Sequence, residues 1–164
     1  MILFRKANNA DAENVLSLYR SAVGGEFCTW NEYYPTETEV DYDLSADSLF
    51  VLEEDGRIIG AGSIVPENEL DGSSVWEEDN AGEIARIVVS PECRGRGLSA
   101  VIVEGLTKRL RENGRSAVHL SVAVKNIPAR RTYEKLGFEI KDKCQIYGND
   151  YYLSEKIFKE KTNA

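Results

Sequence analysis

Two arginines and two glycines are packed together in the segment Arg94-Gly95-Arg96-Gly97. The segment lies between an apolar, strand-like run and a run with helical periodicity, so we expect it at the start of a helix. The first N–H groups of a helix lack partners, the helix dipole is positive there, and glycines let a ligand approach the backbone closely. Bare backbone and positive charge at this position indicate a phosphate-binding loop.

Two common phosphate-binding motifs do not fit this loop. Gly95, Gly97 and Ala100 match the spacing G-x-G-x-x-A of a dinucleotide fingerprint. That fingerprint also requires an acidic residue about 20 positions downstream, and residues 113–130 contain no Asp or Glu. The P-loop pattern G-x-x-x-x-G-K-[ST] is absent from the chain. Dinucleotide-dependent redox chemistry and P-loop chemistry are therefore both disfavoured.

A second segment, Asn126–Phe138, carries a tyrosine that could do chemistry. It contains a predicted helix from Pro128 to Leu136, with proline in its first turn and Gly137 as its stop. Tyr133 shares one helical face with other apolar residues of this helix, so plain core packing explains it as well.

Together the two segments resemble the GNAT N-acetyltransferase superfamily. Arg94–Ser99 is similar to its R/Q-x-x-G-x-G/A loop, with Ser99 in place of the last Gly or Ala. Asn126–Phe138 is similar to its pattern Asn-x-x-Ala-x-x-x-Tyr-x-x-x-Gly-Phe, and one predicted helix and one strand separate the two segments, as in the family. The resemblance is close over Gly82–Cys144. It implies that acetyl-CoA is the cosubstrate and that a primary amine attacks it directly in a ternary complex.

The resemblance also implies residue roles. The pyrophosphate of acetyl-CoA would be held by Arg94, Gly95, Arg96, Gly97, Leu98, Ser99 and Ala100. The strand Ile87-Val88-Val89 would pair with the pantetheine arm like an added strand. Asn126 would either cap its helix or bind the cofactor, and both alternatives stay open. Tyr133 would donate a proton to the departing CoA thiolate.

Glu83 is the candidate general base. It opens the same strand at even spacing from Ile87 and Val89, so regular pleating predicts that it faces their side. Many relatives place a carboxylate that deprotonates the amine near this position, commonly through a water molecule. An exposed glutamate at a strand end is the alternative, and Glu77 and Glu78 in the preceding loop are further candidates.

Phe27–Pro35 is a polar stretch rich in aromatic residues. In the family that the chain resembles, the segment around the first two helices commonly walls the acceptor site. The residues suited to an amine-binding pocket, with cation–π contact available, are Trp30, Asn31, Tyr33 and Tyr34. Packing of these rings onto the core explains them equally well. The acceptor itself, an amine-bearing small molecule or a peptide, is not identified by the sequence.

Composition narrows the function classes. The 164 residues, 42% hydrophobic and 29% charged, are typical of a globular protein and predict one domain over residues 1–164. No apolar run approaches the roughly 18 to 20 residues of a membrane span, and the early charges disfavour a signal peptide. Three scattered cysteines without metal-like spacing favour reduced thiols in a cytoplasm and predict no metal site. The one histidine, His119, is interpreted as an ordinary strand residue.

The net charge is compatible with an amine as the partner but does not identify it. A net charge of −8 disfavours nucleic-acid binding. An acidic surface attracts a cationic partner such as a protonated amine, but it also simply keeps a protein in solution. The presence of Tyr133 and Glu83 favours an enzyme over a non-catalytic acyl-CoA-binding or sensing domain of the same fold. Relatives are often dimers, so a homodimer is compatible with the resemblance.

Seven strands and four helices are expected to position these residues. The predicted strands are Ile2–Ala7, Ser48–Glu53, Arg57–Val65, Gly82–Val89, Ala117–Val122, Phe138–Cys144 and Asp150–Phe158. The predicted helices are one containing Val15–Val23, capped by Asn9 or Asp11, and Thr36–Leu44, Gly97–Glu112 and Pro128–Leu136. Pro66–Asn80 is expected to be a loop. These elements and the resemblance predict a single-domain α/β fold of GNAT type, with a central mixed, mostly antiparallel sheet flanked by about four helices.

Overall fold

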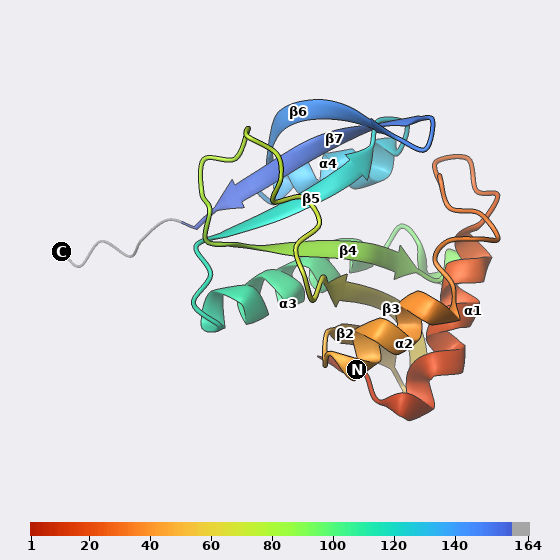
Figure 1. Ribbon diagram of the computed structural model, residues 1–164. Helices are drawn as coiled ribbons and strands as arrows, with labels where there is room; N and C mark the ends of the chain where they lie inside the picture. The colour runs from red at the N-terminus through yellow and green to blue at the C-terminus, as the bar shows by residue number, and fades with distance from the viewer. Residues whose placement is uncertain (159–164) are drawn as a thin grey trace.

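The computed structural model describes residues 1–158, and over these residues the chain forms one seven-stranded sheet in the order β1-β2-β3-β4-β5-β7-β6 (Figure 1). The strands are β1 (Ile2–Lys6), β2 (Leu49–Glu54), β3 (Arg57–Ile64), β4 (Ala81–Val89), β5 (Ala117–Ala123), β6 (Glu139–Ile146) and β7 (Asn149–Ile157). The helices are α1 (Ala12–Ala22), α2 (Glu37–Ser45), α3 (Leu98–Glu112) and α4 (Ile127–Lys135). Each pair of neighbouring strands is antiparallel except β4 with β5, which is parallel. The predicted mixed, mostly antiparallel α/β fold with four helices is confirmed. Residues 159–164 of the predicted domain lie outside the described residues.

The helices cover both faces of the sheet. Alternating side chains of β2 point to opposite faces, so Leu49 and Val51 pack with α1 and α2, whereas Phe50 and Leu52 pack with α3. Figure 1 shows α1 and α2 on one face of the sheet and α3 and α4 on the other. None of the helices within residues 1–158 is long and apolar enough to cross a membrane.

Local polar contacts set where the helices begin. The Thr36 side chain accepts a hydrogen bond from the Thr38 amide (3.3 Å) and starts α2. Before α1, the Asn8 side chain accepts from the Ala10 amide (2.9 Å), and Asp11 accepts from the Asn8 amide (2.8 Å). Asn8 therefore caps the short 3-10 turn over Asn9–Asp11 that precedes α1. Of the predicted caps, Asp11 occupies the N-cap position of α1, without a side-chain hydrogen bond to that helix.

The two halves of the sheet meet along a short seam. β4 and β5 pair only where Ala81–Glu83 lie beside Ala117–His119, and beyond these three residue pairs the strands diverge (Figure 1). Among residues 1–158, no strand pairs with the side of β4 that faces β5 from Ile84 onward.

A bulge in β4 changes which residues face which side. Arg86 has a positive φ of 53°, and the register between β3 and β4 shifts beside it. Ile84, Ile87 and Val89 all pack on the α3 side, so the alternation slips by one residue between Ile84 and Ile87. Glu83 therefore faces the opposite side, and the prediction that it shares a face with Ile87 and Val89 was wrong. Regular pleating fails here because the bulge inserts one extra residue.

Candidate active site

A cavity of about 650 Å³ fills the gap between the diverging strands. Its walls include Ile84–Val89 of β4 and Ser121–Ala123 of β5. The loop before α3, the start of α4 and the segment Glu26–Trp30 close it on the other sides. The cavity has the size of a small-molecule or cofactor site. It brings the predicted phosphate loop, the predicted pairing strand and Tyr133 together.

The phosphate loop has the backbone that an anion site needs. Gly95 and Gly97 have positive φ values of 80° and 73°, a conformation that glycine adopts without strain. Gly97 precedes α3, and no side chain caps that helix, so its first amides are available to a ligand. Arg94 lines the cavity with Gly95, Gly97, Leu98 and Ser99, whereas Ala100 does not.

Arg96 is turned away from the cavity. Its guanidinium forms two hydrogen bonds with the Glu54 carboxylate on β2, Nη1 to Oε1 at 3.0 Å and Nη2 to Oε2 at 2.5 Å. Arg96 is not among the lining residues. Of the two arginines of the predicted phosphate loop, only Arg94 lines the cavity.

Tyr133 lies in the cavity wall as a protonated phenol. Its ring packs edge-on against Phe138, with 5.7 Å between centroids. Burial raises the pKa of the Tyr133 hydroxyl above its ordinary value, so the group keeps its proton at neutral pH. Asn126, also in the wall, caps α4 by accepting a hydrogen bond from the Ala129 amide (3.3 Å).

Glu83 lies just outside the cavity, under the loop between β3 and β4. Its Oε1 accepts hydrogen bonds from the amides of Glu69 (2.9 Å) and Leu70 (2.8 Å). Burial raises the pKa of this carboxyl from 4.5 to about 7, although the two amide hydrogen bonds act to lower it. A carboxyl that titrates near neutrality has the pKa expected of a general base. The alternative of an exposed glutamate is wrong, because only 4% of its surface is exposed.

The further candidate bases lie elsewhere. Glu77 forms an ion pair with Lys141, and neither Glu77 nor Glu78 lines the cavity. Their backbone amides donate to the buried Glu155 carboxylate at 3.1 and 3.2 Å. Both residues therefore anchor their loop to β6 and β7.

The aromatic segment contributes to the cavity in part. Trp30 lines it and packs edge-on against Tyr19. Asn31, Tyr33 and Tyr34 do not line it. The neighbouring Thr29 hydroxyl lies 2.8 Å from the hydroxyl of Tyr151 on β7, and this contact joins the segment to β7 at the cavity wall.

Sequence reasoning missed a buried ion pair that involves Arg86, one of the residues in the cavity wall. Arg86 donates from Nε and Nη2 to the two carboxylate oxygens of Asp43 on α2, at 3.0 and 2.8 Å. It also donates from Nη1 to the Tyr34 hydroxyl at 3.1 Å, and the Ser63 hydroxyl donates to Asp43. The one charged residue in the apolar run Ile84–Val89 was the available signal. The pair fixes the β4 bulge to the helical layer.

Sequence reasoning also missed the partners of His119. Its Nε2 lies 2.6 Å from Oε2 of Glu155, and both residues are buried. The Trp76 indole stacks on the His119 ring with centroids 3.8 Å apart. These partners are 36 and 43 positions away in the sequence, so no local pattern links them.

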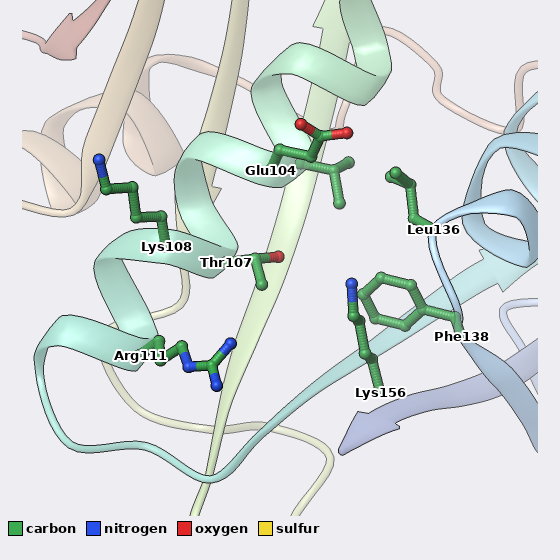
Figure 2. A pocket seen from close by; sticks show the side chains of 8 residues that line it. Glu104, Thr107, Lys108, Arg111, Leu136, Phe138 and Lys156 are labelled. Carbon is green, nitrogen blue, oxygen red and sulfur yellow. The ribbon is translucent and has the colours of Figure 1, made fainter. Parts of the chain in front are cut away.

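A second hollow of about 210 Å³ lies between α3 and the α4–β6 connection (Figure 2). Thr107 and Lys156 point toward one another across it, and Glu104, Lys108 and Arg111 line its α3 side. It contains no residue of the phosphate loop or of the β4 bulge. The two hollows are therefore separate.

The sheet thus opens between its two parallel strands, and a glycine-rich loop at the start of a helix and the half-buried Tyr133 lie at the opening. The chain belongs to the Acetyltransferase (GNAT) family, whose profile matches residues 15–138.

Individual relatives agree with this assignment. The chain is 32% identical over 145 residues to an uncharacterized N-acetyltransferase of Methanocaldococcus jannaschii, covering 84% of this chain and 61% of that protein. It is 28% identical over 156 residues to an N-alpha-acetyltransferase of Sulfurisphaera tokodaii, covering 91% and 89%. A putative acetyltransferase of Salmonella typhimurium, solved with acetyl-CoA, superposes with a TM-score of 0.76 at 19% identity and covers 100% of this chain and 98% of that one.

Proposed function

We propose that this protein is an N-acetyltransferase that moves an acetyl group from acetyl-CoA to a primary amine by direct attack in a ternary complex. The observation that carries the proposal is one cavity lined by the phosphate loop, the unpaired side of β4 and Tyr133. Membership of the GNAT family and the acetyl-CoA bound to the Salmonella typhimurium neighbour support it.

The residues of the cavity fit acetyl-CoA. Arg94 and the uncapped amides at the start of α3 supply positive charge and donors for a pyrophosphate. The β4 backbone from Ile84 to Val89 offers amides and carbonyls to the amide groups of a pantetheine arm. Bound acetyl-CoA supplies a thioester whose carbonyl carbon the amine attacks, with departure of the CoA thiolate.

Tyr133 is the proposed proton donor to the sulfur. A free thiol has a pKa of about 8.5, so protonation of the leaving thiolate assists the reaction without a strong acid. Tyr133 holds its proton because burial disfavours the phenolate. A β4 amide facing the gap is the proposed donor to the oxygen that gains charge during attack.

Glu83 is the proposed base. Both amide hydrogen bonds reach Oε1, which leaves Oε2 to take a proton. Because Glu83 lies outside the cavity, a water molecule must carry the proton from the amine. The proton lost by the amine goes to Glu83, and the proton gained by the thiolate comes from Tyr133. After each turnover Glu83 releases its proton to solvent and Tyr133 takes one up, which restores both residues.

An amine-acceptor screen tests the proposal. Purified protein would be incubated with acetyl-CoA and a panel of polyamines, amino acids, aminoglycosides and peptides, with CoA release and product mass as readouts. We expect one acceptor class to gain 42 Da, the mass of an acetyl group replacing a hydrogen, at roughly 1–10³ turnovers per second. Tight acetyl-CoA binding without turnover on the whole panel would instead support the non-catalytic acyl-CoA-binding domain.

A further inference from the structure

The loop between β3 and β4 is fastened to the sheet at two points. Near its start, the amides of Glu69 and Leu70 donate to Glu83 on β4. Near its end, the amides of Glu77 and Glu78 donate to Glu155 on β7. We call the segment from Glu69 to Glu78 the strap. In Figure 1 it crosses in front of β4 and β5, on the face opposite α3 and α4.

Three buried side chains form the seat of the strap. Glu83 is the register partner of His119, and His119 is the register partner of Glu155, so the three lie in a row across β4, β5 and β7 on one face. The strap rests on this row near its end, because Trp76 stacks on His119. The Trp76 indole N–H also donates to the Leu70 carbonyl at 2.8 Å. Trp76 thus joins the seat to the residue that touches Glu83.

We propose that the strap holds the Glu83 carboxyl in the buried, hydrogen-bonded position that acetyl transfer requires. In this proposal Trp76 and His119 are positioning residues, because they hold the strap in place. The inference rests on the role of Glu83 in the proposed function. Trp76 holds Leu70 through the hydrogen bond to its carbonyl, and the amides of Leu70 and Glu69 donate to Glu83. Removal of the Trp76 side chain is therefore expected to release these two amides from the Glu83 carboxyl.

The strap acts on Glu83 in two opposing ways. It buries the carboxyl, which raises the pKa, and it donates two hydrogen bonds, which lower it. Burial is the larger effect, and the charges of Glu69 and Asp71 on the strap raise the pKa further. From the other elements, the His119–Glu155 pair faces Glu83 along the row, and Lys141 of β6 holds Glu77 at the far end. Opening the strap should therefore lower the pKa of Glu83 toward 4.5.

The test measures the pKa of Glu83 directly and needs no acceptor. Protein labelled with ¹³C at the glutamate carboxyl carbon would be titrated by NMR, and Glu83 assigned by the signal lost in Glu83→Gln. We expect a pKa near 7 in the wild type and a decrease of at least one unit in Trp76→Ala. Trp76→Phe keeps a ring on His119 but loses the N–H, and should give a smaller decrease. The matched control is Trp30→Phe, which changes the other tryptophan and should leave the pKa of Glu83 unchanged.

Kinetics separate this inference from the proposed base. With the best amine of the screen, the apparent pKa of the acid limb of the profile of kcat against pH should be lower in Trp76→Ala than in the wild type. The decrease should equal the decrease in the Glu83 pKa measured by NMR, while the acetyl-CoA KM stays constant. An unchanged Glu83 pKa in folded Trp76→Ala, or in Trp76→Phe where the alanine variant does not fold, overturns the strap proposal. If the NMR value shifts and the acid limb does not, Glu83 is not the base, and the positioning role falls with it.

Discussion

Tyr133 and Glu83 approach the gap between β4 and β5 from opposite faces of the sheet. Tyr133 packs with the α3 side, whereas the Glu83 carboxyl is held by the strap on the other side. In the proposed reaction, the amine loses its proton on one face and the thiolate gains one on the other. The proposed proton donor and proton acceptor therefore stand on opposite faces of the sheet.

At Tyr133 the substitution Tyr133→Phe removes one hydroxyl and keeps the ring against Phe138. We expect kcat to fall by about 10²–10⁴, the usual contribution of one general acid, with acetyl-CoA affinity nearly retained. A thioester with a more acidic leaving thiol should reduce the loss, because its thiolate needs less protonation. Steady-state kinetics measure both effects, with the fully exposed Tyr147→Phe as control. Wild-type rates with both thioesters would leave Tyr133 a packing residue.

Glu83 also makes stability depend on pH. Its pKa is raised from 4.5 to about 7 in the folded protein, so the folded state binds the proton more tightly than the unfolded state. This contribution is fully present below pH 4.5 and is lost as pH rises through 7. At about 1.4 kcal/mol per pKa unit, the wild type should lose roughly 2–3 kcal/mol relative to Glu83→Gln between pH 5 and pH 8. Urea unfolding of both proteins at the two pH values measures it; parallel stabilities would contradict the buried, raised pKa.

At the scale of elements, the start of α3 separates two arginines that are equivalent in the sequence. Arg94 lines the cavity, and Arg96 is held by Glu54. A charge-assisted hydrogen bond contributes about 1.5–3 kcal/mol, so Arg94→Gln should weaken CoA binding by roughly 10–100-fold. Arg96→Gln should change it less than about threefold, since its cost falls on an exposed pair. Isothermal titration with CoA compares them, and equal losses would show that Arg96 leaves Glu54 to bind the ligand.

Sequence reasoning succeeded where structure is local. Helix α3 and its glycine loop, the hairpin of β2 and β3, and the stop of α4 at Gly137 all follow from residues within a few positions of one another. It failed at the β4 bulge, because the conformation of Arg86 depends on Asp43 in another layer. The side of Glu83 and the seat of Trp76 on His119 could not be predicted for the same reason: tertiary pairing across β4, β5 and β7 creates them.

At the scale of the whole molecule, the two halves of the sheet are joined by three residue pairs between β4 and β5 and by packing on α3. A ligand lying in the gap contacts both halves, and it binds only the folded protein. At a CoA concentration 100 times Kd, this linkage stabilises the fold by about 2.7 kcal/mol, which corresponds to a rise in Tm of about 5–10 °C. Thermal unfolding with and without CoA measures the rise, and Arg94→Gln at the same CoA concentration should show a smaller one. A Tm that is the same with and without CoA would mean that CoA does not bind in the gap.

The short pairing between β4 and β5 should also affect the rates at which backbone amide hydrogens exchange with solvent. Those amides of Ile84–Val89 that face β5 have no partner strand, whereas amides between β2 and β3 are paired along both strands. In deuterated water the first set should exchange early and the second late. Saturating CoA should slow the early set while leaving β2 and β3 unchanged, so the opened edge of a single strand marks, residue by residue, where the ligand completes the sheet.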